Sequence, residues 1–307
     1  MATSWGRNTG VQADSARPLT LTYGPFGSGG EIEMLLGRAD GSTGALVPLY
    51  SFARVRMAVK DVVARVGSFA AYAGASVDSV VGGAATQQLT VRTLDHMMFR
   101  NVGGRFTATP LAAEAQQAPA FASAIADFDG DGAEDLFLGQ NFFPTMIGMP
   151  RHDQGRGLLL RGDGAGALMP LSAQQSGIAV YGDQRGAAYA DFNRDGRLDL
   201  AVSQNGDQTR LFENRGARVG LRVRLRGPSG NPDGVGAQLR IVYGATMGPV
   251  REVQAGSGYW SQNGAVQLFG LRATPTGVWV RWPGGAVHRM PVPAGAREIA
   301  VPFDSAR

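Results

Sequence analysis

The chain has 307 residues, which is enough for one large domain or two ordinary ones with a substantial core. It contains no cysteine, which excludes disulfides, iron–sulfur clusters and thiol nucleophiles, while its 45 glycines indicate many tight turns and hence short strands. The net charge of +4 comes from arginines scattered along the chain, so we expect no nucleic-acid binding.

Two classes of segment are missing from the sequence. No run approaches about 18 uninterrupted apolar residues, so we expect no membrane-spanning helix. The N-terminal residues MATSWGR lack the apolar stretch of a secretory signal peptide. Any export of this protein would therefore depend on a signal that lies outside these residues.

Apolar residues recur every three or four positions between Ser51 and Ala73, which predicts one amphipathic helix. Ser51 is placed to cap its N-terminus, and Gly74 is placed to end it. A short second helix is predicted near Val77–Val81. We expect these helices to cover an open side of a sheet.

The rest of the chain has the pattern of strands and turns, because short apolar runs alternate with Gly, Pro, Asn and Asp. The architecture is therefore predicted to be mostly β with a helical insertion. The predicted strands are Leu136–Leu138, Gly157–Leu160, Leu200–Ser203, Leu221–Leu225, Leu239–Val242 and Val278–Trp282.

One segment of the sequence is repeated. Residues 126–141 read ADFDGDGAEDLFLGQN, and residues 190–205 read ADFNRDGRLDLAVSQN. Such repetition indicates a supersecondary unit that stacks on copies of itself. A third, degenerate copy aligns at residues 23–36, where Pro25, Gly27 and Gly29 replace the acids and Glu33 alone keeps a carboxylate.

Oxygen-bearing residues in each repeat fall at loop positions 1, 3, 5 and 9, and glycines between them let the chain curl. Alternate oxygens then converge on one point, as Ca²⁺ requires with its six to eight oxygen ligands. Mg²⁺ is less suitable because it retains several waters. The predicted ligands of the first loop are Asp127, Asp129, Asp131, the carbonyl of Ala133 and Asp135. Those of the second loop are Asp191, Asn193, Asp195, the carbonyl of Arg197 and Asp199.

The sequence thus predicts two calcium ions, with tighter binding at the first loop because it has one more carboxylate. The degenerate copy should hold no ion. An EF-hand is excluded, since position twelve is Leu138 or Val202 where an EF-hand has a bidentate glutamate. Because each ion would lock a glycine-rich turn, its expected role is structural.

These loops and the strands after them resemble the FG-GAP or VCBS repeats of integrin-type β-propellers, in which each repeat is a four-stranded blade with calcium in a loop. The later sequence resembles the ASPIC/UnbV domain that follows such repeats in the cartilage acidic protein-like family. That resemblance depends on NPDGVGA from Asn231, REVQAGSGYWSQ from Arg251, FGL from Phe269 and VRWPGG from Val280.

The resemblance implies an all-β fold: a partial β-propeller with a helical insertion and a C-terminal β domain. The expected divisions are a degenerate blade at residues 1–49, the helical insertion at 50–92, two calcium-binding blades at 93–217 and the ASPIC/UnbV domain at 218–307. A closed propeller commonly has more blades. We therefore expect the remaining blades to lie outside this chain, with an open arc completed by the helix or by a partner as the alternative.

The block GSGYWSQN from Gly256 groups two aromatic rings with amide and hydroxyl side chains. Tyr259, Trp260 and Gln262 form a candidate site for a sugar or a peptide, with core packing and turn formation as the alternative. No nucleophile elbow, phosphate loop or dinucleotide motif occurs in the sequence.

The function expected from sequence and resemblance together is a non-catalytic, calcium-binding interaction module. The resemblance implies an extracytoplasmic location, either secreted, periplasmic or on the cell surface. Two alternatives stay open: an adhesin for a carbohydrate or protein ligand, and an enzyme with structural calcium.

Overall fold

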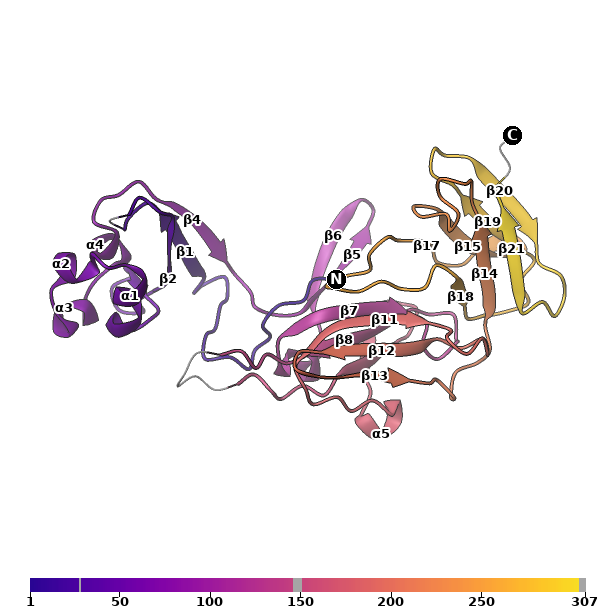
Figure 1. Ribbon diagram of the computed structural model, residues 1–307, viewed down its shortest axis with the longest axis horizontal. Helices are drawn as coiled ribbons and strands as arrows, with labels where there is room; N and C mark the ends of the chain where they lie inside the picture. Colours follow the sequence, from indigo (N-terminus) through magenta and orange to yellow (C-terminus); the bar gives the residue numbers. More distant parts are fainter. Residues whose placement is uncertain (28, 146–150, 304–307) are drawn as a thin grey trace. The chain divides into compact units, whose positions relative to one another are not determined.

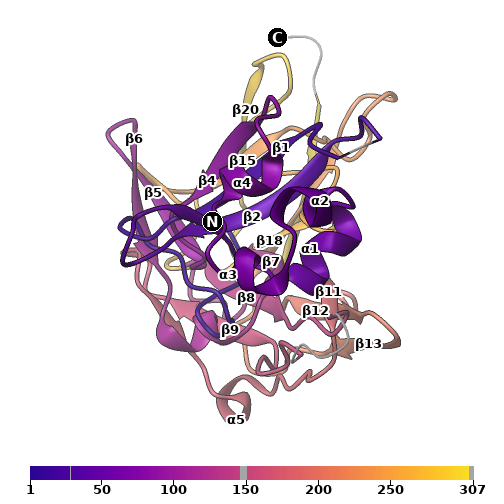
Figure 2. The ribbon, with the colours of Figure 1, turned by 90° about the vertical axis from the view of Figure 1, so that its left-hand side faces the viewer.

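A computed structural model describes residues 1–27, 29–145 and 151–303 (Figures 1 and 2). The chain divides into two compact units, one of Thr9–Leu94 and one of Met1–Asn8 with Asp95–Arg307. Strands predominate over helices among the described residues, which confirms the mostly β architecture. In the part of the chain that the structure describes, no helix is both long and apolar enough to cross a membrane.

The smaller unit contains an antiparallel sheet with the strand order β3-β2-β1-β4. The first two strands form a hairpin around the degenerate repeat, and the last strand returns from the helices to pair with β1. Their bounds are β1 Leu19–Gly24, β2 Glu33–Ala39, β3 Leu46–Pro48 and β4 Gln87–Val91. Four helices gather on one side of this sheet (Figures 1 and 2).

The prediction of one helix from Ser51 to Ala73 is wrong, because the segment forms three short helices. The chain turns at Gly67, whose φ of 83° is left-handed, and Ser68 then caps a new helix by accepting a hydrogen bond from the Ala71 amide at 3.1 Å. The predicted helix at Val77–Val81 is confirmed. The four helices are α1 Phe52–Ala58, α2 Val62–Val66, α3 Phe69–Ala73 and α4 Val77–Val81.

The helices and the sheet of this unit share one hydrophobic core. Phe52, Val62 and Val77 of the helices pack in the same cluster as Phe26 and Leu35 of the sheet region. Residues that the sequence assigned to a degenerate blade and to a helical insertion are therefore parts of one folded unit. The expected boundary at residue 50 does not separate two cores.

Two sheets of the larger unit are meanders in which strands adjacent in sequence are neighbours in space. In each of them the acid-rich loop joins the first two strands, which are antiparallel. The first sheet comprises β7 Ala120–Ala126, β8 Asp135–Gln140, β9 Leu158–Gly162 and β10 Leu168–Pro170. The second comprises β11 Gln184–Ala190, β12 Asp199–Gln204 and β13 Asp207–Phe212.

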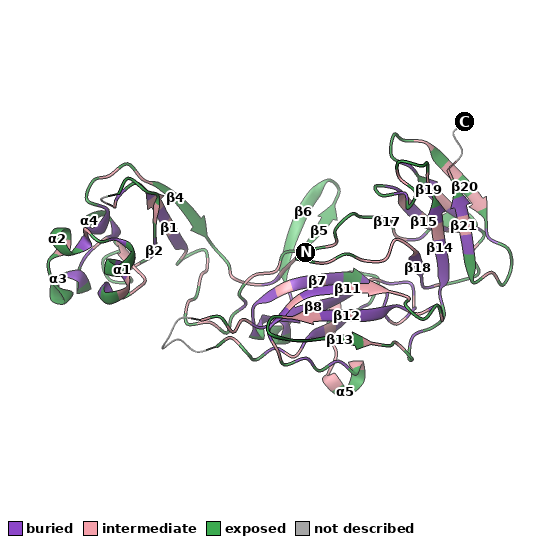
Figure 3. Cartoon of the chain, in the orientation of Figure 1, coloured by how far each residue is buried: buried purple, intermediate pink, exposed green. Residues whose placement is uncertain are grey.

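The two meanders pack together through a core that contains small side chains. Ala122 and Ala124 of β7 are buried in it with Phe137 of β8 and Val202 of β12. The residues that alternate with these alanines, among them Phe121, lie on the other face of β7 and are partly exposed. Strand β8 is buried along its whole length (Figure 3). Among the described residues neither sheet closes on itself.

Shorter elements flank the first meander. A two-stranded hairpin precedes it, and a bridge between Ala2 and Met97 ties the N-terminal residues to that hairpin. Apart from its first two residues, the hairpin is exposed. These elements are β5 Met97–Val102, β6 Arg105–Pro110, the 3₁₀ helix η1 Ala113–Gln117 and the helix α5 Ala173–Ser176.

The C-terminal part of the larger unit is a separate β layer with its own core. Its two sheets have the orders β18-β14-β21 and β16-β15-β19-β20, with β17 paired to β15. Trp282 is only 2% exposed and lies in the core between them. The strands are β14 Leu221–Arg226, β15 Gln238–Tyr243, β16 Thr246–Met247, β17 Arg251–Glu252, β18 Gln267–Phe269, β19 Gly277–Arg281, β20 Val287–Pro291 and β21 Glu298–Pro302.

Candidate metal centre

The first acid-rich loop gathers carboxylates between β7 and β8. One oxygen each from Asp127, Asp129 and Asp135 lies within 4.8 Å of the others. Asp127 and Asp135 are 4% and 2% exposed, so these two charges are removed from water. Side chains of His, Cys, Asp and Glu can hold a metal ion when they lie close enough together, and among the described residues these three acids form such a group.

Backbone amides fix the two buried carboxylates of this loop. Asp127 accepts hydrogen bonds from Gly130 at 2.8 Å and from Gly132 at 2.9 Å. Asp135 accepts them from Phe128 and from Gly162, both at 2.8 Å. Gly130 and Gly132 have φ values of 74° and 89°, a left-handed conformation that favours glycine. The predicted curling of the chain at these glycines is therefore present.

Burial acts against the negative charge at this site. It raises the pKa of Asp135 to about 7 and also raises the pKa of Asp127. Neighbouring acids add to the effect, including Asp129 beside Asp135. A hard cation would offset both the burial and the mutual repulsion, and carboxylate oxygens are the ligands that Ca²⁺ takes. The donor set of the first loop therefore fits this ion.

Two of the predicted ligands of the first loop stand apart from this group. Asp131 is not among the three clustered acids, and its carboxylate accepts a hydrogen bond from the Ala133 amide at 2.7 Å. The backbone of Ala133 is thus held in the loop by the side chain two residues before it. Asp131 and Ala133 therefore shape the turn in the arrangement seen here.

The second loop has the same backbone pattern between β11 and β12. Asp191 accepts hydrogen bonds from the amides of Asp195 at 3.0 Å and Gly196 at 2.9 Å. Asp199 accepts one from Phe192 at 3.0 Å, as Asp135 does from Phe128 in the first loop. The repeat found in the sequence is therefore also a repeat in hydrogen bonding.

The charges around the second loop differ from those around the first. The guanidinium group of Arg222, in β14, forms an ion pair with Asp191, and both side chains are less than 10% exposed. Arg197 pairs with Asp195 at 3.2 Å, and the Asn193 amide group donates to that same carboxylate. Arginines of the chain itself thus pair with Asp191 and Asp195, and the side chains of the four predicted side-chain ligands of this loop all take part in hydrogen bonds or ion pairs.

The C-terminal β layer contacts both loops. Next to the first loop, Arg272 donates two hydrogen bonds to the Gly132 carbonyl, at 2.7 and 3.1 Å. A β-carbon on Gly270 would overlap Oδ2 of Asp127, so only glycine fits at that position. Beside the second loop, the Gly220 amide donates to the Gly196 carbonyl at 2.8 Å. The sequence did not indicate these partners, because they lie far along the chain.

The degenerate repeat keeps the hairpin but not the acids. Glu33 is the first residue of β2, just as Asp135 and Asp199 are the first residues of β8 and β12. Phe26, which lies in the loop before it, is buried in the core of the smaller unit. Ser28 lies outside the described residues. That this loop holds no ion stays a prediction.

The aromatic block lies in a loop of the C-terminal layer. Trp260 is 82% exposed and Tyr259 is 42% exposed, and their rings stack with centroids 5.4 Å apart. Gln262 instead shapes the loop, since its amide group bonds to the backbone of Gly256 and Gln254. Of the three candidate ligand-binding residues, the two aromatic ones thus present their rings to solvent.

No curated protein matches this chain. Residues 227–305 match the family model described as ASPIC and UnbV. This range begins just after β14 and spans β15 to β21, so it covers most of the C-terminal layer whose core contains Trp282. The C-terminal β layer of this chain is therefore an ASPIC/UnbV domain.

Proposed function

We propose that this protein is a non-catalytic interaction module whose first acid-rich loop binds Ca²⁺. The observation that carries this proposal is the group of three carboxylates, two of them almost fully buried, with oxygens within 4.8 Å of one another. A buried acid is stable in its charged form only when it has a partner. Calcium bound by Asp127, Asp129 and Asp135 would supply that partner.

The role that we assign to the ion is structural. The first loop lies between two strands of one sheet and also touches the ASPIC/UnbV domain through Gly270 and Arg272. An ion in this loop would stiffen a turn rich in glycine and would hold its carboxylates in place against that domain. Both effects favour the folded chain, because a ligand that binds only the folded state stabilises it.

We further infer that the two meanders are blades of the FG-GAP/VCBS type. Each has its acid-rich loop between its first two strands, and the two sheets pack face to face through Ala122, Ala187 and Val202. In this proposal the module acts outside the cytoplasm, where calcium is available as a structural ion. It would work by presenting a surface to a ligand.

Thermal unfolding of the full chain tests the proposal. We expect calcium at a hundredfold excess over its Kd to stabilise the fold by about 2.7 kcal/mol relative to a chelator, and Mg²⁺ at the same concentration to do less. The double variant Asp127→Asn/Asp129→Asn should lose this response. Asp233→Asn, at an exposed position outside the loops, serves as the matched control. An equal midpoint with calcium and with chelator would refute the structural role.

A further inference from the structure

A row of aromatic rings crosses the surface of the larger unit next to the first sheet. Starting at Trp260, it passes through Tyr259, Phe121 and Phe142 to Trp5, with successive ring centroids 5.3 to 5.7 Å apart. These rings come from four separate segments of the sequence. Trp260, Tyr259 and Trp5 are at least 40% exposed, so the row is accessible at both ends.

The outer end of the row is held rigidly. Ser261 and Asn263 bond to the amides of Ala187 and Tyr189 in β11, at 2.9 and 3.1 Å. Trp260 itself has a φ of 48°, a left-handed conformation that is unusual for a bulky residue. Strained backbone that its surroundings maintain is concentrated at functional sites. The exposed indole of Trp260 is therefore held by an unfavourable backbone conformation. Packing in a core does not explain this conformational cost, because the side chain is exposed.

A polar cavity begins beside this platform. The face of β7 that carries Phe121 continues through Ser123, which lines a cavity of about 270 Å³ together with Gln254, Ser257 and Asn263. The Ser257 hydroxyl is buried and has no hydrogen-bond partner among the described residues. A buried hydroxyl without a partner is unfavourable, so this group is suited to bind a polar ligand.

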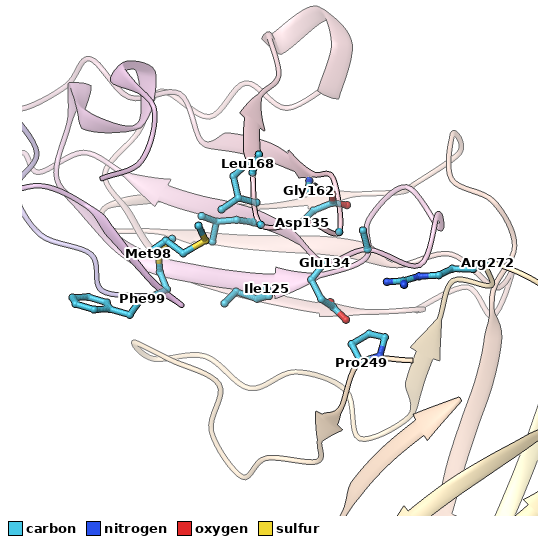
Figure 4. Close-up of a pocket in the computed structure, with 15 residues that line it drawn as sticks. Met98, Phe99, Ile125, Glu134, Asp135, Gly162, Leu168, Pro249 and Arg272 are labelled. Carbon is cyan, nitrogen blue, oxygen red and sulfur yellow. Dashed lines mark hydrogen bonds between the residues drawn. The ribbon is translucent and has the colours of Figure 1, made fainter. Parts of the chain in front are cut away.

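A second cavity, of about 320 Å³, lies next to the polar one. Ile125 and Glu134 line both cavities, and the second one reaches Met98 and Leu168. Figure 4 shows Glu134 directed towards Pro249, with Ile125 beside it. The two cavities adjoin at Ile125 and Glu134, between β7 and the ASPIC/UnbV domain, and we call the pair of cavities the groove. A ligand that reached both cavities would be long and narrow.

We propose that the platform and groove bind a linear oligosaccharide, with one sugar stacked on Trp260. A pyranose has an apolar C–H face that suits an exposed ring and hydroxyls on its rim that suit paired polar groups. The groove offers such groups in Ser257 and in the Glu134–Arg251 pair, which is 2.8 Å apart. This inference rests on the proposed interaction function and names the ligand class.

An extended peptide is the competing occupant. Peptides that bind along a strand need pockets for alternate side chains, or an aromatic groove for proline. The cavity beside Ser257 instead contains Ser123, Glu134, Arg251, Gln254 and Asn263, which are polar, and the apolar lining lies mainly in the second cavity. Side chains of this kind match closely spaced hydroxyls better than they match apolar side chains.

Isothermal titration calorimetry on the full chain in saturating calcium tests the proposal. The probes are cellohexaose, xylohexaose and chitohexaose. We expect at least one of them to bind, and Trp260→Ala to weaken that binding at least tenfold. Ser257→Val, which removes the unpartnered hydroxyl, should weaken it less. Phe106→Ala, at an exposed ring outside the row, should leave it unchanged.

The outcomes separate the two proposals. Binding of none of the three hexasaccharides, or equal binding by wild type and Trp260→Ala, would overturn the saccharide assignment. So would binding of a decaproline peptide that depends on Trp260. Each variant is melted with calcium and with chelator in parallel, which shows that it is folded. An absent calcium response refutes the structural ion, whatever the saccharides do.

Discussion

The two acid-rich loops share a sequence pattern and a hydrogen-bonding pattern, yet their negative charge is balanced in different ways. At the first loop the nearby guanidinium of Arg272 bonds to a backbone carbonyl, and three carboxylates are left close together. At the second loop Arg222 and Arg197 bond to the carboxylates themselves. The motif therefore specifies the turn, whereas the residues that contact it determine how its negative charge is balanced.

This difference sharpens the sequence-based ranking of the two sites. The first loop was expected to bind calcium more tightly because it has one more carboxylate than the second. The structure adds a second reason, since an ion at the second loop would have to displace the buried guanidinium of Arg222 from Asp191. Replacing a partner that is already in place reduces the net gain from binding.

Removing one predicted ligand from each loop gives the largest contrast. We expect Asp127→Ala to reduce the calcium affinity of the first loop more than about a hundredfold, because a charge pair at 4 Å is worth about 4 kcal/mol at an effective dielectric of 20. Asn193→Ala removes a neutral, exposed ligand of the second loop and should change calcium binding far less. Calorimetric titration measures both, and equal effects would contradict the ranking.

Arg222→Gln tests the internal cation of the second loop. Without calcium this variant should lose about 3 kcal/mol of unfolding free energy, because Asp191 stays buried without its partner. With calcium the loss of unfolding free energy should be smaller, because an ion can then take the place of the missing guanidinium beside Asp191. Chemical denaturation in calcium and in chelator measures both values. A deficit of the same size in the two conditions would show that the second loop does not bind calcium.

Gly270→Ala tests the contact between the first loop and the ASPIC/UnbV domain. The added methyl group would overlap Asp127, so we expect a loss of about 1 to 3 kcal/mol and weaker calcium binding. Gly216→Ala is the control, because a β-carbon there would meet nothing within 4 Å. If both variants melted alike with calcium, the close packing at Gly270 would be unimportant.

Asn193→Asp should give the smallest effect. It restores the acid that the first loop has at the same position, but in an exposed place where one charge contributes at most about 1 kcal/mol. We expect the calcium affinity of the second loop to rise less than about tenfold. Combined with Arg222→Gln, the gain should be larger, and a double-mutant titration would detect this coupling. Strict additivity would argue that Arg222 does not control the second loop.

Features that depend on short segments were predicted well from the sequence. The curled turns at the loop glycines and the strands after each loop follow from residues within one repeat. The break in the helical segment was also signalled locally, by Gly67 followed by the capping residue Ser68. Because the apolar periodicity continues across that break, it predicted one continuous helix.

Partners from distant parts of the chain were not predictable. Arg222 alternates with apolar residues in β14, and nothing near it in the sequence indicates its burial, yet it is 6% exposed. Gly270 and Arg272 reach the first loop only because the ASPIC/UnbV domain folds against it. Likewise, Phe121 and Trp5 gave no sign that they would extend the row begun by Tyr259.

The parallel pairing of β14 with β21 has a consequence for biosynthesis. Glu298, at the start of β21, bonds to Arg222 at 3.0 Å and so supports the guanidinium that neutralises Asp191. The ribosome adds Asp191 first, Arg222 later and Glu298 last of the three. The ion pair of Asp191 with Arg222 can therefore form only after β14 has been synthesised, and its support by Glu298 only after β21 has been synthesised. The second loop thus reaches its final balance of charge late, because two of the side chains that settle it come from strands made after it.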